Sequence, residues 1–211
     1  MHETVMDPVS RYIVSSDELI IPEGEVLRYL GISKAAASED DISLVKKHTE
    51  DIRKIIAPKA CYSRYETGVE GDSIMLPSGP VKSVSLSKNL YGCSGVFIFA
   101  ATIGIEFDRV LYRARYTSMA DAAVIQAVGA AAAEALVESL VSHLEETVEP
   151  EGLRLRPRFS PGFGDFGLEH QKEIFSFLNP SKEIGLSLKD NLIMVPEKSV
   201  TALAGIYKKD E

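Results

Sequence analysis

The sequence places one glutamate inside a long apolar stretch. Glu134 stands in residues 129–137 (GAAAAEALV), and no lysine or arginine lies within two helical turns of it. Because burying a carboxylate without a partner costs several kcal/mol, this position requires a cation if it is buried. Three interpretations are open: a lysine or arginine of another element neutralises Glu134, the side chain faces water, or it receives the ammonium group of a ligand. Glu138, one turn further on the same helical face, is a second candidate for that ammonium.

An arginine followed by a proline-glycine turn is the second feature with chemical potential. Arg158 opens the run RFSPGFGD, in which Pro161 and Gly162 indicate a turn and Phe163 follows. The planar guanidinium of Arg158 suits a carboxylate held by two parallel hydrogen bonds. Gly162 permits close approach of a ligand to the backbone, and the Phe163 ring offers a face to a cation. The alternative is an ordinary turn that carries a surface arginine.

Several kinds of self-contained chemistry are disfavoured. Cys61 and Cys93 are the two cysteines, and neither belongs to a Cys-x-x-Cys pair, which excludes a disulfide scaffold, an iron–sulfur cluster and a four-cysteine zinc site. Both are interpreted as small buried side chains. No nucleophile elbow or phosphate-binding loop occurs. The histidines lack metal-ligand spacing and are expected on the solvated surface: His2, His48, His143 and His170.

Composition indicates an acidic, folded protein. The chain has 211 residues with 45% hydrophobic side chains and a net charge of −8, so a basic surface for nucleic acid or anionic lipid is not expected. We expect a single domain over residues 1–211, with helices and a β-rich part in 1–90 and the motif-bearing part in 91–211. Residues 1–11 lack the layout of a signal peptide, and the apolar stretch 119–137 contains polar residues that disfavour a membrane span. A cytoplasmic protein is therefore expected.

The pattern of apolar residues predicts an α+β fold. Helices are predicted within 20–31 and over 38–57, 105–115, 118–147 and 168–178. Ser38 or Asp40 can cap the helix over 38–57. Short strands are predicted within 61–86, where 81–86 is the last, and over 95–101, 153–158, 183–188, 192–195 and 200–207. Without βαβ spacing, a twisted, mainly antiparallel sheet with flanking helices is favoured.

The turn also carries a family resemblance. Arg158-x-x-Pro161-Gly162-Phe163, with Lys172 nine residues after Phe163, resembles the Arg-x-x-Pro-Gly-Tyr signature of the activation domain of cobalamin-dependent methionine synthase. Three further segments resemble that domain in the same order: the apolar run 95–104, the helix around Glu134, and Met-x-Pro-x-x-Ser-Val-Thr at 194–201. The resemblance covers about residues 90–206, with the first 90 matching in outline.

The resemblance implies a C-shaped fold that binds S-adenosylmethionine. In that family the domain presents this methyl donor to cob(II)alamin while a flavodoxin-type protein supplies an electron, which serves methionine biosynthesis. The residues implied to bind the ligand are Glu134, Arg158, Pro161, Gly162, Phe163, Ser199, Val200 and Thr201. No catalytic residue and no metal ligand are implied in this chain.

The chain lacks the remaining parts of a methionine synthase. Neither the Asp-x-His-x-x-Gly cobalamin motif nor the zinc-binding cysteines is present. The resemblance therefore implies a reactivation subunit, an accessory part of a methyltransferase, that acts in trans on a methionine synthase or another corrinoid protein. No nucleic acid and no membrane are expected as partners.

Two departures from the family pattern motivate an alternative. Phe163 lacks the hydroxyl of the usual tyrosine, and Glu151 stands one position away from the family's acidic residue before the arginine. The alternative is a non-catalytic scaffold that binds a corrinoid protein and has lost S-adenosylmethionine binding. A third possibility, an independent small-molecule methyltransferase, is disfavoured because no general base stands near the motif.

Overall fold

A five-stranded antiparallel sheet forms the centre of the molecule, which a computed structural model describes for residues 8–208. Every recorded pairing in it is antiparallel, which confirms the predicted fold class. Its strands lie in the order β1 (Ser10–Ile13), β2 (Lys59–Glu66), β6 (Cys93–Thr102), β10 (Ser199–Lys208) and β7 (Leu153–Leu155).

The central strand β6 is buried on both faces, as predicted for residues 95–101. Phe97 and Phe99 enter one hydrophobic core, whereas Val96 and Ile98 enter the other. This division follows from the alternation of side chains along a strand. The sheet therefore separates two cores, and a residue's position along a strand decides which core it faces.

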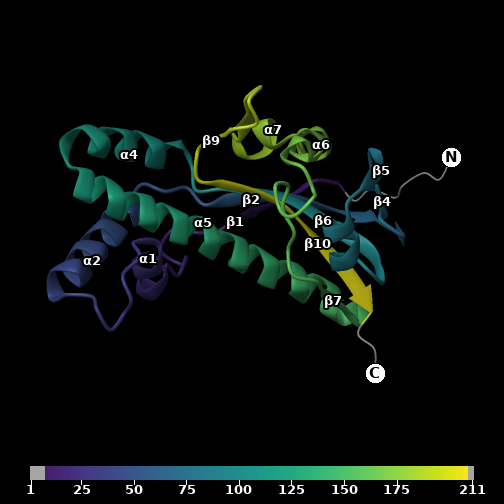
Figure 1. Cartoon of the computed structure of the whole chain (residues 1–211), viewed down its shortest axis with the longest axis horizontal. Helices are drawn as coiled ribbons and strands as arrows, with labels where there is room; N and C mark the ends of the chain where they lie inside the picture. Colours follow the sequence, from purple (N-terminus) through teal and green to yellow (C-terminus); the bar gives the residue numbers. More distant parts are fainter. Residues whose placement is uncertain (1–7, 209–211) are drawn as a thin grey trace.

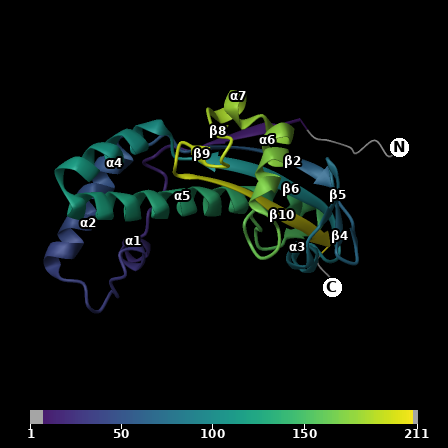
Figure 2. The same cartoon turned by 45° about the horizontal axis from the view of Figure 1, so that its top comes forward.

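Helices cover the first face of the sheet. The longest, α5 (Met119–Val148), runs along the sheet and begins at Ser118, whose hydroxyl accepts the backbone N–H of Asp121. This confirms the helix predicted over 118–147. Figure 2 shows α5 beneath the strands, with three more helices gathered at its N-terminal end: α1 (Glu23–Tyr29), α2 (Glu39–Arg53) and α4 (Ile105–Thr117).

Small residues let α5 pack closely. Gly129 lies directly against the ring of Phe107 in α4, and a Cβ at this position would overlap that ring. Alanines at 131 and 132 are likewise fully enclosed in the first core. By length and composition alone α5 could cross a membrane, so the composition argument against a membrane span is not sufficient. Within the protein, 61% of the most apolar stretch of this helix is buried, as expected of a core helix.

Hairpins and short helices cover the second face (Figure 1). The elements on this side are β3 (Val69–Glu70), β4 (Ser73–Leu76), β5 (Gly79–Lys82), α3 (Val84–Asn89), the 3-10 turn η2 (Leu168–His170), α6 (Gln171–Leu178), α7 (Pro180–Ile184), β8 (Ser187–Leu188) and β9 (Met194–Val195). A second 3-10 turn, η1 (Glu149–Glu151), continues the C-terminal end of α5.

The structure corrects two strand predictions. Residues 81–86 leave β5 and enter helix α3, because Ser83 caps the backbone N–H of Leu86. Residues 183–188 begin inside helix α7, which starts at Pro180, and only Ser187–Leu188 forms a strand. Proline suits a first helical position because its missing N–H has no partner there.

The expectation of surface histidines is also wrong in part. His48 is buried, and its Nε2 lies 3.0 Å from a carboxylate oxygen of Asp121. The His170 ring stacks on Phe166 at 4.6 Å. His2 lies outside the described residues. Cys61 and Cys93 are buried free thiols, as predicted.

Candidate functional site

Arg158 stands at the edge of the sheet, where the chain leaves β7 and runs on beside β10. Arg156 donates its backbone N–H to the carbonyl of Gly205 at 2.8 Å, and Phe159 exchanges two 2.8 Å backbone hydrogen bonds with Leu203. The side chain of Phe159 packs on the second core. Because successive side chains point to opposite faces, Arg158 is directed toward α5.

Glu134 meets Arg158 there. The Nη2 atom of Arg158 and the Oε2 atom of Glu134 form an ion pair, with side chains 25% and 34% exposed. The fold thus confirms the first interpretation of Glu134: an arginine of another element neutralises it. Both groups remain within reach of solvent, so the pair forms part of a surface site and not of the sealed core.

The Pro-Gly turn follows directly and holds Phe163 outward. Gly162 has a φ of 93°, a conformation that favours glycine, and its N–H donates to the carbonyl of Phe166 at 2.7 Å. Pro161 is buried beneath the turn. Phe163 is 50% exposed, and its ring packs edge-on against Phe159 at 5.8 Å. The turn that follows Arg158 therefore carries an exposed aromatic ring, packed on Phe159.

Asp165 fastens this turn to α3. Its carboxylate accepts hydrogen bonds from the Ser83 hydroxyl at 2.7 Å, and from the backbone N–H groups of Val84 at 2.7 Å and Ser85 at 2.9 Å. The Ser83 hydroxyl first, and then the two N–H groups, hold the pKa of Asp165 well below its usual range. The negative charge at the start of α3 thus fixes the loop that carries Phe163.

Ser160 is a polar residue of the turn that the sequence argument missed. It is only 8% exposed, and its Oγ is buried without a hydrogen-bond partner among the described residues. An unsatisfied buried hydroxyl costs about 1–3 kcal/mol, so a water or ligand group is expected to pair with it. In the sequence, only its position two residues after Arg158 indicated that Ser160 could belong to the site.

The segment at Ser199, Val200 and Thr201 begins β10 on the same edge. The Ser199 hydroxyl already donates to the carbonyl of Pro196 at 2.8 Å, Val200 packs on the first core, and Thr201 is buried. The recorded pairing with the chain after β7 ends at Leu203. Every second residue of a strand turns its backbone N–H and C=O toward the same neighbour. The backbone of Thr201, two residues before Leu203, therefore points to the same side as that of Leu203, past the end of the pairing with Phe159. Thr201 can therefore contribute backbone hydrogen bonds to a ligand there. The backbone of Val200 faces β6, and the Ser199 N–H already donates to the carbonyl of Glu197 at 3.0 Å.

Three other residues from the sequence argument are not joined to Arg158 by a recorded contact. Glu138 and Lys172 are exposed. Glu151 pairs with Arg64 of β2 through two hydrogen bonds of 2.8 and 3.0 Å. That double hydrogen bond lowers the pKa of Glu151, whose carboxylate is therefore engaged on another strand.

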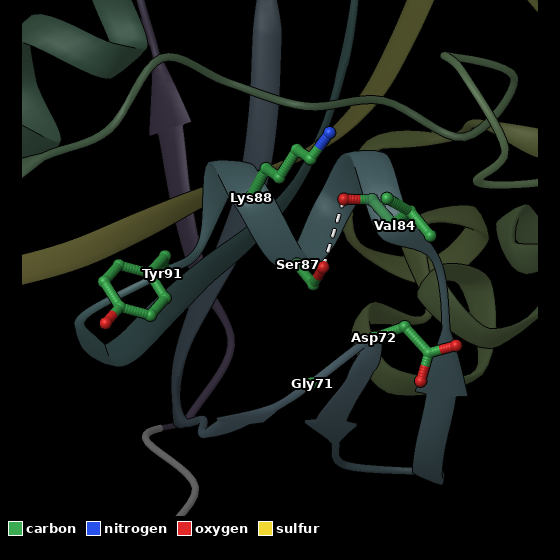
Figure 3. A pocket seen from close by; sticks show the side chains of 6 residues that line it. All are labelled: Gly71, Asp72, Val84, Ser87, Lys88 and Tyr91. Carbon is green, nitrogen blue, oxygen red and sulfur yellow. Dashed lines mark hydrogen bonds between the residues drawn. The ribbon is translucent and has the colours of Figure 1, made fainter.

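A hollow of about 430 Å³ lies elsewhere, between α3 and the β3–β4 turn (Figure 3). Its lining residues are Gly71, Asp72, Val84, Ser87, Lys88 and Tyr91, and none of them was predicted as a site residue. Figure 3 shows the Lys88 ammonium and the Asp72 carboxylate pointing away from one another. Arg158 and Glu134 do not belong to this lining.

The arrangement around Arg158 suits binding of a charged small molecule. Within residues 8–208, no group of three or more histidine, cysteine, aspartate or glutamate side chains could hold a metal ion. Burial raises the pKa of the Cys61 thiol to about 12, which leaves it unreactive as a nucleophile near neutral pH. A guanidinium, a carboxylate, an unpaired hydroxyl and an open strand edge together can recognise a ligand that is both zwitterionic and rich in hydrogen-bonding groups.

The fold has a solved counterpart, although the sequence has no match among family models or curated proteins. A crystal structure of the MetH reactivation domain bound to AdoHcy is similar with a TM-score of 0.72, over 97% of this chain and 80% of that chain. The two sequences are 15% identical over the alignment. At this identity the likeness shows a shared fold.

Proposed function

We propose that this protein binds S-adenosylmethionine at the Arg158 turn and serves as a reactivation subunit for a separate corrinoid protein, a methionine synthase in the first place. The observation that carries the proposal is the meeting of Arg158 and Glu134 at a Pro-Gly turn. It occurs in a fold whose solved counterpart is a reactivation domain with AdoHcy bound.

Each end of the ligand has a suitable group in this chain. Arg158 would hold the carboxylate of the amino acid, and Glu134 would hold its ammonium. The exposed ring of Phe163 offers a face to the sulfonium, for which a hydroxyl is not needed. The Ser160 hydroxyl, which has no partner within residues 8–208, and the backbone of Thr201 supply hydrogen bonds for the nucleoside.

The protein's part in the reaction is to hold the methyl donor. S-adenosylmethionine supplies a methyl group for the corrinoid of the partner protein, and AdoHcy remains when that methyl has left. Reduction of cob(II)alamin requires one electron, for which we propose a flavodoxin-like or other electron-donor protein. We propose that it acts in trans on a corrinoid carried by another protein, and we place it in the cytoplasm.

Two measurements test the proposal in order. Calorimetric titration of the protein with AdoHcy measures ligand binding directly. Conversion of cob(II)alamin to methylcobalamin on the partner enzyme, with S-adenosylmethionine and a reductant, is then compared with and without this protein. We expect binding heat in the first and stimulation in the second; absence of stimulation would discard the reactivation role.

A second function is favoured by the ion pair itself. Because Arg158 and Glu134 already neutralise one another, the turn can be stable without a ligand. The protein would then be a scaffold that binds a corrinoid protein and no S-adenosylmethionine. Calorimetry separates the two functions, since the scaffold would give heat with the corrinoid protein and none with AdoHcy.

A further inference from the structure

In the free protein Arg158 and Glu134 form an ion pair, and a ligand whose carboxylate takes both hydrogen bonds of the guanidinium edge must separate them. We propose that this ion pair is a selectivity filter, which admits ligands with both a carboxylate and a neighbouring ammonium group and rejects ligands that offer the anion alone. The inference rests on the proposed ligand site and adds a rule for which ligands that site accepts.

The geometry of the ion pair allows the two side chains to separate. One guanidinium nitrogen contacts one carboxylate oxygen, and no other hydrogen bond to Arg158 is recorded among residues 8–208. The remaining N–H donors of Arg158 are available to an incoming carboxylate. Partial exposure, 25% for Arg158 and 34% for Glu134, gives that carboxylate a path to the pair.

A zwitterionic ligand compensates for both separated charges. Its carboxylate replaces Glu134 at Arg158, and its ammonium replaces Arg158 at Glu134, so neither side chain is left unpaired. An anionic ligand leaves Glu134 without a cation and brings a second negative charge beside it. A bound ligand also displaces water from these partly exposed groups, so like charges that it places together there are less screened than in the free protein and repel one another.

Glu134→Gln tests the filter because it removes the charge and keeps the side-chain size. The probes are AdoHcy and its deamino analogue, in which hydrogen replaces the α-amino group. We expect the wild-type protein to prefer AdoHcy by about 100-fold or more, since like-charge contact costs several kcal/mol. In Glu134→Gln the analogue should bind about tenfold tighter than in wild type, and the preference should fall to about threefold.

Two further variants make the test specific. Glu146→Gln makes the same charge change at an exposed position about three turns further along α5, roughly 18 Å away, and should leave both affinities unchanged. Glu134→Asp keeps the negative charge and should keep the preference for AdoHcy. Thermal melts of all variants establish that the protein titrated is folded.

The outcomes distinguish the filter from the ligand site. If wild type binds neither probe, the proposed ligand site fails and the filter fails with it. If wild type binds AdoHcy but Glu134→Gln weakens both ligands in parallel or leaves the preference unchanged, the filter is wrong and the ligand site stands.

Discussion

Arg158 and Glu134 lie 24 residues apart in the sequence and meet in an ion pair between the sheet edge and α5. If Arg158 also holds the ligand carboxylate, Arg158→Ala should remove a charge-assisted pair worth roughly 2–5 kcal/mol. The affinity for AdoHcy, measured by calorimetry, should fall by about 30-fold or more. Arg158→Lys should recover only part of this, because an ammonium cannot form the planar two-bond contact.

A thermal melt is the control for this prediction. Glu134 is partly exposed, so water can solvate its carboxylate when Arg158 is removed, and the melting temperature should stay near the wild-type value. A variant that unfolds readily, while its folded fraction binds AdoHcy normally, would show that the arginine only neutralises Glu134.

Ser160→Ala should change stability and affinity in opposite directions. The variant removes a buried hydroxyl that has no partner among the described residues, so the free energy of unfolding should stay level or rise by up to about 1 kcal/mol. If the ligand pairs with Ser160 Oγ, the affinity for AdoHcy should fall by about three- to tenfold. Denaturant unfolding and calorimetry give the two numbers. Lower stability in the variant would mean that a bound water already satisfies the hydroxyl.

Asp165→Asn should lower stability at neutral pH and loosen the turn that carries Phe163. Since folding lowers the pKa of Asp165, its stabilisation is fully present above the usual aspartate pKa of about 3.9. It is lost as the pH falls below that value toward the lowered pKa. Melting temperatures measured from pH 7 to pH 2 should therefore differ between wild type and variant by a constant amount down to about pH 4 and draw together below it.

The matched control is Asp190→Asn, a change of the same kind on an exposed loop. Its melting curve should follow that of the wild type throughout. Curves for Asp165→Asn that stay parallel to the wild-type curve down to pH 2 would contradict the assignment of this carboxylate as the titrating group.

Gly129→Ala should destabilise the protein although alanine is the better helix former. The new methyl would overlap the fully buried ring of Phe107, and such overpacking typically costs about 1–3 kcal/mol. The gain in helix propensity offsets at most about 1 kcal/mol. Denaturant unfolding should give a lower midpoint, which Phe107→Leu in the same chain should partly restore. A midpoint above wild type would mean that α4 and α5 move apart easily.

Local pattern was sufficient for the long elements. The alanine-rich apolar stretch predicts a helix over 118–147, and the structure has α5 at Met119–Val148. The uninterrupted apolar run 95–101 predicts a strand buried on both faces, which is the centre of β6. Both are long enough for their periodicity to outweigh local ambiguity.

Short elements depended on contacts that the local pattern does not contain. Residues 81–86 read as a strand, yet α3 begins there, because Ser83 caps it and Asp165, 81 residues from Val84, accepts the N–H groups of its first turn. Over so few residues, one distant carboxylate outweighs β propensity.

The candidate site divides in the same way. The sequence by itself determined that Glu134 would need a cation if it were buried and that the guanidinium of Arg158 suits a carboxylate, because both follow from charge and shape alone. It left open whether either side chain simply faces water. Only the tertiary structure decided that each is the other's partner. Strand register turns Arg158 toward α5 and brings it to Glu134, and register is a property of the whole sheet.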